Sequence, residues 1–90
     1  MLDIVSSNRF KKDLKLAIKR GYNIKLLDDV VNMLAMQKPL EEKYKDHELT
    51  GDFKGFRECH ITPDWLLIYQ INDSELVLYL SRTGTHSDLF

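Results

Sequence analysis

The 90-residue chain has a single cysteine, Cys59, so it cannot form an internal disulfide, and we expect a reducing compartment. No apolar run approaches the roughly 20 residues that span a bilayer. The opening MLDIVSSNRF lacks the basic start and the apolar block of a signal peptide. We therefore expect a cytoplasmic protein without a membrane partner.

Glycine and proline are also scarce, with four glycines and two prolines. The glycines are scattered, which excludes a glycine-rich phosphate-binding loop. Repeats, linkers and low-complexity stretches are absent as well, while the hydrophobic share of 43% and the charged share of 30% are ordinary for a globular protein. A chain of this length forms one small core. We therefore expect a single domain over residues 1–90.

The formal net charge is −1, which by itself argues neither for nor against a polyanionic partner. Positive charge is concentrated in residues 9–20, where a single anion, Asp13, accompanies six cations: Arg9, Lys11, Lys12, Lys15, Lys19 and Arg20. Such a run is most often the solvated face of a helix. A contact surface for a phosphate backbone is the less common alternative, and it would make binding depend on salt.

The first half of the chain shows one short strand pattern and two helix patterns. Residues 2–5 alternate weakly, and the polar residues after them suit the start of a helix. Apolar residues within 9–20 recur at helical spacing, which predicts an amphipathic helix with its lysines facing solvent. A second apolar stripe follows Asn23 and predicts a helix that ends before Pro39.

Three strand patterns fill the second half of the chain: residues 56–61, 65–71 and 75–81. Short turns containing Pro, Asp, Asn and Ser separate them, which predicts sequential antiparallel neighbours. Together with the first strand and the helices, the pattern predicts an α+β fold: two helices pack on one face of a mostly antiparallel four-stranded sheet. Residues 38–56 show no period, and loops of such length are often functional.

The three histidines all lie in loops or at strand ends, where catalytic groups concentrate. His47 lies in the long loop, His60 ends the strand before the turn that contains Asp64, and His86 follows the last strand. A lone histidine in such a place is most often a surface residue. If the last two strands pair, however, the end of the last strand returns to this turn. We then expect His60, Asp64 and His86 to converge and the loop with His47 to close over them.

Histidine, with an ordinary pKa of about 6.5, is the natural proton donor or acceptor at neutral pH. Two imidazoles can cleave RNA without a metal: one takes the proton of the attacking 2′-hydroxyl, and the other protonates the departing 5′-oxygen. A nearby cation stabilises the phosphoryl charge. Arg57 and Arg82 are the available cations, although a surface salt bridge is the more common role of each. Arg82 is the better candidate because it begins the segment Arg-Thr-Gly-Thr-His.

Two other chemistries are weaker. A zinc site could use the three imidazoles and Asp64, but the spacing 47–60–64–86 contains no short ligand pair of the usual kind. Nucleophilic hydrolysis lacks a recognisable motif around Ser81 and Ser87, and Cys59 in a strand pattern is more often a small buried hydrophobe. We therefore expect neither a metal nor another cofactor.

Several motifs together resemble the YafQ-type branch of the RelE/ParE toxin superfamily, the toxins of bacterial type II toxin–antitoxin systems. They are Lys-Asp-His at residues 45–47, GDFKGFR at 51–57, His-Ile-Thr-Pro-Asp-Trp at 60–65 and Arg-Thr-Gly-Thr-His at 82–86. The stretch FKKDLKLAIKRG fits the first helix of the same family. The resemblance therefore covers essentially the whole chain.

The resemblance implies a microbial-ribonuclease-like fold and an endoribonuclease, an mRNA interferase that cuts mRNA in the ribosomal A site without a metal. It also implies a cognate antitoxin as the neutralising partner. It assigns the catalytic set to His47, His60, Asp64 and His86. It also assigns to Phe90 the aromatic ring that contacts a nucleobase. We expect His86 to transfer a proton with Asp64 as its partner. The other two histidines are expected to position the phosphate or to share the proton transfer.

The resemblance further implies RNA binding or transition-state support from basic residues, for which Arg82, Arg57 and Lys54 are the candidates. The net charge of −1 departs from the basic character that is common in ribosome-binding members, so residues 9–20 and Lys54 form the remaining basic surface. Two alternatives stay open: a ParE-like toxin that binds DNA gyrase without nuclease activity, and a catalytically inactive antitoxin-binding domain. The three histidines argue against a pure binder.

Overall fold

The computed structural model describes all 90 residues, and it begins with a strand that leads directly into a capped helix. Strand β1 (Asp3–Ser6) is followed by Ser7, whose hydroxyl accepts a hydrogen bond from the N–H of Phe10 at 2.9 Å. This side chain satisfies one of the free N–H groups at the start of helix α1 (Asn8–Lys19). The same hydroxyl donates to the carbonyl of Ser81 at 2.7 Å, which fixes the start of the helix to the sheet.

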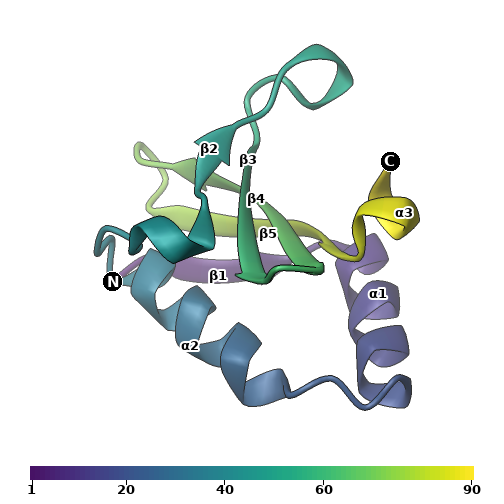
Figure 1. Cartoon of the computed structure of the whole chain (residues 1–90). Coiled ribbons are helices and arrows are strands. Elements are labelled where there is room, and N and C mark those ends of the chain that lie inside the picture. The colour runs from purple at the N-terminus through teal and green to yellow at the C-terminus, as the bar shows by residue number, and fades with distance from the viewer.

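Helix α2 (Ile24–Ala35) is capped by Asn23, whose side chain accepts from the N–H of Lys25 at 3.2 Å. Its buried residues recur at helical spacing, as the sequence predicted: Leu27, Val30, Val31, Leu34 and Ala35. Figure 1 shows both helices on the same face of the sheet. None of the helices combines the length and the apolar character that crossing a membrane requires.

The remaining strands are β2 (His47–Glu48), β3 (Arg57–Thr62), β4 (Trp65–Asn72) and β5 (Val77–Gly84). The sheet order is β1-β5-β4-β3-β2, with β1 parallel to β5 and every other pair antiparallel (Figure 1). This confirms the α+β class and the sequential antiparallel strands. The sheet has five strands rather than the predicted four, because two-residue β2 is too short to leave a pattern in the sequence.

The side chains of β4 alternate between two hydrophobic clusters, because successive residues of a strand point to opposite faces. One cluster is the main core under the helices, and β4 contributes three residues to it: Trp65, Leu67 and Tyr69. The other cluster lies on the opposite face. It consists of Leu66 and Ile68 from β4 and Leu89 from the last helix, α3 (His86–Leu89). Partly buried loop residues cover it: Leu49, Phe53 and Phe56. The face without α1 and α2 is therefore partly covered.

The end of the chain differs from the prediction. Strand β5 continues to Gly84 rather than ending at Ser81, and the single-turn helix α3 follows it. Thr83 is only 1% exposed, and its hydroxyl donates to the carbonyl of Leu66 at 2.7 Å and accepts from the indole N–H of Trp65 at 2.8 Å. These bonds allow a polar residue inside a buried strand. The prediction ended the strand at Ser81 because strands were recognised by their apolar residues, and Thr83 is polar.

Candidate active site

Three of the candidate residues come together because their strands meet at one end of the sheet. His60 in β3 lies opposite Leu66 in β4, and Leu66 lies opposite Gly84 in β5. As a result His60, Asp64 and His86 line one open cavity of about 570 Å³, the histidine cavity. The convergence expected from the sequence is therefore present. The other residues that line this cavity are Tyr22, Pro63, Leu66, Thr85 and Ser87.

His60 is held in the wall of the histidine cavity by contacts at both ring nitrogens, with 25% of its side chain exposed. Its Nδ1 lies 3.3 Å from the carbonyl oxygen of Pro63. Since a carbonyl can only accept, this contact places a proton on Nδ1. Nε2 lies 3.5 Å from Oε1 of Glu58. The ring therefore lies between the cavity and a carboxylate.

Glu58 is a component of the site that the sequence analysis missed. It is only 6% exposed, and its Oε1 lies 3.5 Å from Nε2 of His60 and 3.7 Å from Nε2 of His47. Glutamate is almost never buried unless it is paired, and here one carboxylate faces two imidazoles. A signal was present in the sequence, because residues two apart in a strand share a face, as Glu58 and His60 do.

His47 is joined to this group through Glu58 and does not line the histidine cavity. It lies in β2 opposite Glu58, with 50% of its side chain exposed. Its Nδ1 lies 2.7 Å from the carbonyl of Lys45, so the ring is oriented by its own loop. The loop therefore flanks the cavity, which corrects the expectation that it closes over the other histidines.

Asp46 anchors the loop immediately before His47. It accepts a hydrogen bond from the hydroxyl of Tyr69 and two from the guanidinium of Arg57, both at 3.3 Å. Burial and the bond to Asp46 raise the pKa of Tyr69 above its ordinary value, so the phenol keeps its proton and remains a donor. Burial opposes the charge of Arg57, but its bonds to Asp46 and Tyr69 outweigh burial and raise its pKa. The backbone that carries His47 is consequently fixed to the sheet.

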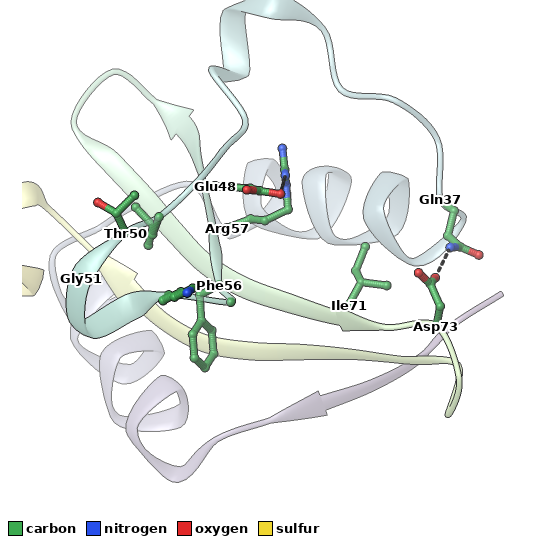
Figure 2. A pocket seen from close by; sticks show the side chains of 11 residues that line it. Gln37, Glu48, Thr50, Gly51, Phe56, Arg57, Ile71 and Asp73 are labelled. Atoms are coloured by element: carbon green, nitrogen blue, oxygen red, sulfur yellow. Dashed lines mark hydrogen bonds and ion pairs between the residues drawn. The ribbon is translucent and has the colours of Figure 1, made fainter.

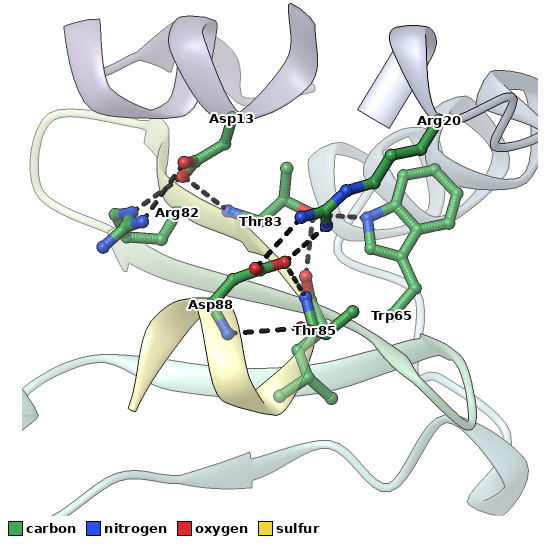
Figure 3. A network of polar contacts seen from close by, with 8 residues as sticks. Asp13, Arg20, Trp65, Arg82, Thr83, Thr85 and Asp88 are labelled. Carbon is green, nitrogen blue, oxygen red and sulfur yellow. Dashed lines mark hydrogen bonds and ion pairs between the residues drawn. The ribbon is translucent and has the colours of Figure 1, made fainter. Parts of the chain in front are cut away.

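The predicted cations do not line the histidine cavity. Arg82 donates from Nε to Asp13 at 2.7 Å, which raises the pKa of Arg82, and its side chain is only 18% exposed (Figure 3). Arg57 and Lys54 line a different cavity of about 820 Å³, where Arg57 lies beside Glu48 (Figure 2). The structure therefore does not bring these three cations into the histidine cavity, and their contact with RNA stays a prediction.

Phe90 lies beside His86 at the end of α3. The two ring centroids are 5.0 Å apart with an interplanar angle of 33°. Phe53, in the short helix η2 (Gly51–Phe53), contacts Phe90 edge-on at 5.5 Å. Since Phe90 is still 52% exposed, part of its ring is open to solvent next to a residue of the histidine cavity.

A polar network holds α3 in place (Figure 3). The Thr85 hydroxyl accepts from the N–H of Asp88 at 3.2 Å, and the Asp88 carboxylate accepts from the N–H of Thr85 at 2.9 Å, a capping box. Arg20, at the end of α1, donates to the same carboxylate at 2.7 and 3.2 Å. Arg20 and the Thr85 N–H hold the pKa of Asp88 well below its usual range. A Cβ at Gly84 would lie 3.0 Å from that of Asp88, so a larger residue there would require the Asp88 side chain to shift.

The structure also bears on the two weaker chemistries. Cys59 is fully buried, and burial raises the pKa of its thiol to about 12, so the thiol is protonated at neutral pH and is no nucleophile. No group of three or more histidine, cysteine, aspartate or glutamate side chains is arranged to hold a metal ion. The zinc ligand set considered from the sequence, three imidazoles and Asp64, is therefore not assembled.

A family model described as a bacterial toxin of type II toxin-antitoxin system, YafQ, matches residues 2–90. The chain belongs to the YafQ family. A curated relative, the mRNA interferase toxin YafQ of Escherichia coli strain K12, is 44% identical over 89 residues, which cover 98% of this chain and 95% of the relative. The match includes every motif on which the resemblance was based, so the membership predicted from the sequence is confirmed.

Solved structures of YafQ and related toxins share the fold. A metal-bound toxin from Helicobacter pylori superposes with a TM-score of 0.94 at 54% identity, covering 100% of both chains. YafQ from E. coli strain BL21(DE3) gives 0.92 at 42% identity, covering 100% of this chain and 99% of the other. YafQ in an E. coli DinJ–YafQ complex gives 0.90 at 43% identity with the same coverage. The YafQ fold is thus established, while the catalytic roles of individual residues stay predictions.

Proposed function

We propose that this toxin cuts mRNA by metal-independent acid–base chemistry in the histidine cavity. The observation that carries the proposal is the meeting of His60, Asp64 and His86 in one open cavity of about 570 Å³. The E. coli relatives are named mRNA interferase toxins, which supports RNA as the substrate. Imidazoles on a solvent-open wall are suited to donate and accept protons at neutral pH.

The proposed reaction forms a bond between the 2′-oxygen and phosphorus and breaks the bond between phosphorus and the 5′-oxygen. One histidine removes the proton of the 2′-hydroxyl, and another protonates the departing 5′-oxygen. The products are a 2′,3′-cyclic phosphate and a 5′-hydroxyl end. His86, which shares the cavity wall with Asp64, is one proton-transfer group. His60 is the other, and it acts through Nε2, because its Nδ1 is engaged by the carbonyl of Pro63. Glu58 positions the rings of His60 and His47.

The proposal includes three interactions with larger partners. Phe90, half exposed beside His86, stacks on a nucleobase of the mRNA. The cations of residues 9–20 are all exposed, and those other than Arg20, which pairs with Asp88, offer a surface for ribosomal RNA, with Lys54 as a further contact. Cleavage in the A site should therefore weaken with salt. A cognate antitoxin neutralises the toxin, as suggested by the solved complex of E. coli YafQ with DinJ.

The test is induction of His86→Ala and His60→Ala variants, with cleavage of translated mRNA as the readout. Loss of a general acid or base should lower the rate by roughly 100-fold or more. Asp29→Ala is the control, because Asp29 is an exposed residue of α2 with only a surface pair to Lys25. Unchanged thermal stability and antitoxin binding would show that the fold is intact. Parental activity of the His86→Ala variant would refute the proposal.

Assays of gyrase and of mRNA with the purified toxin distinguish the proposed function from the two alternatives. A gyrase-binding toxin would inhibit supercoiling by purified gyrase and leave mRNA intact. A catalytically inactive antitoxin-binding domain would affect neither gyrase nor mRNA. We expect mRNA cleavage and no effect on supercoiling.

A further inference from the structure

A second, smaller cavity adjoins the histidine cavity. Its volume is about 270 Å³, and six residues line it: Tyr22, Asn23, Leu26, Thr62, Asp64 and Trp65. Tyr22 and Asp64 belong to the walls of both cavities. The two spaces are therefore neighbours that share these two side chains in their walls, so they are placed to receive neighbouring nucleotides of one RNA strand. We refer to the smaller space as the Tyr22 cavity.

We propose that the Tyr22 cavity binds the base of a nucleotide next to the one that is cut, with the ring of Tyr22 as its stacking surface. This inference rests on the proposed RNA cleavage and adds a residue that determines how RNA is positioned. A base rather than a phosphate is the fitting group, because no lysine or arginine lines this cavity. An aromatic face binds any base, since every base has a π-face.

The ring of Tyr22 is held in a fixed position before RNA arrives. It packs against Trp65 with ring centroids 5.0 Å apart and an interplanar angle of 58°. Trp65 is itself buried, and its indole N–H donates to Thr83 at 2.8 Å. The backbone N–H of Tyr22 donates to the carbonyl of Ala17 at 3.0 Å, beyond the end of α1. A ring that is already ordered loses little conformational freedom when a base stacks on it.

Polar groups in the same wall can contact the edge of the base. The side-chain oxygen of Asn23 accepts from the N–H of Lys25 at 3.2 Å, which leaves the amide NH₂ as a donor. Thr62 contributes a hydroxyl, which can donate or accept, and Asp64 contributes a carboxylate, which accepts. The cavity therefore offers one stacking surface and both kinds of hydrogen-bonding group, a combination that suits an unstacked base.

The test compares Tyr22→Leu with Tyr22→Phe in the cleavage of short mRNAs bound to ribosomes. Leucine keeps an apolar cover over Trp65 but removes the aromatic face, so KM should rise by roughly ten-fold or more while kcat changes much less. Phenylalanine keeps the face and should restore tight binding. Tyr79→Leu is the matched control, because Tyr79 is a partly buried tyrosine that lines neither cavity. Equal melting temperatures would exclude a folding defect.

An abasic position in the RNA gives a sharper comparison. Removing the flanking base should weaken binding to the parent protein by roughly ten-fold, and it should make little difference to Tyr22→Leu. Equal losses in both proteins, or an unchanged KM for Tyr22→Leu, would overturn the inference. An oligonucleotide with 2′-deoxyribose at the cut lacks the attacking hydroxyl and is not cleaved. Its binding, measured by fluorescence anisotropy, reports the same contact without cleavage. An inactive parent that still shows the Tyr22 effect would therefore refute only the proposed reaction.

Discussion

Replacing Thr83 with valine should destabilise the protein strongly, because one hydroxyl joins β5 to the start of β4, next to the candidate site. Thr83 donates to the carbonyl of Leu66 at 2.7 Å and accepts from the indole N–H of Trp65 at 2.8 Å. Valine has nearly the same shape but leaves both buried partners without this bond. A buried polar group that loses its partner costs about 1–3 kcal/mol. We therefore expect a loss of about 2–4 kcal/mol, equivalent to a fall in Tm of roughly 10–25 °C.

Urea denaturation and thermal unfolding measure this loss, and two variants test its cause. Thr83→Ser keeps the hydroxyl and removes one methyl group, so it should cost only about 1 kcal/mol. In a Trp65→Phe background the indole N–H is already absent, so Thr83→Val should cost at least about 1 kcal/mol less there. Equal costs in the two backgrounds, or a valine variant more stable than the serine variant, would refute the reasoning.

Three further predictions concern the site. Glu58→Gln should lower the cleavage rate roughly ten-fold or more, because an amide holds the imidazoles of His60 and His47 less firmly than a carboxylate does. The control is Glu48→Gln, which should not lower the rate, since Glu48 is an exposed residue of β2. The folded-state pKa of Asp88 is depressed, so its stabilisation is complete above its ordinary pKa of about 4 and is lost as pH falls. Asp88→Asn should therefore lower Tm at pH 7, and the difference from the parent should shrink below pH 4. Cleavage of ribosome-bound mRNA should be unchanged by a chelator selective for transition metals, which leaves the magnesium of the ribosome in place.

The fold could be predicted because its signals are local. The apolar spacing within α2 and the turn between Thr62 and Trp65 depend on residues close together in the chain. Hairpin order then determines that the end of β5 returns to the start of β4, which brings His86 to His60. The convergence of the candidate site was therefore a consequence of topology.

Other features depend on contacts between distant residues, and these were not visible in the sequence. Arg82 was expected near the histidines, but it pairs with Asp13, which lies in α1. Arg57 likewise pairs with Asp46 in the long loop. Glu58 and His60 are two apart in β3 and share a face by spacing alone, but the contact of Glu58 with His47 depends on how the long loop docks. Which charges pair is decided by how the helices and the loop dock on the sheet.

The ends of the cut RNA provide the most direct test of the account, since acid–base catalysis by the histidines requires the 2′-hydroxyl as the nucleophile. Mass spectrometry of fragments from a defined RNA, with a matched RNA that carries 2′-deoxyribose at the cut, would identify them. We predict 2′,3′-cyclic phosphate and 5′-hydroxyl ends, and no cleavage of the 2′-deoxy RNA. Fragments with 3′-hydroxyl and 5′-phosphate ends, or cleavage at the 2′-deoxy position, would contradict the account.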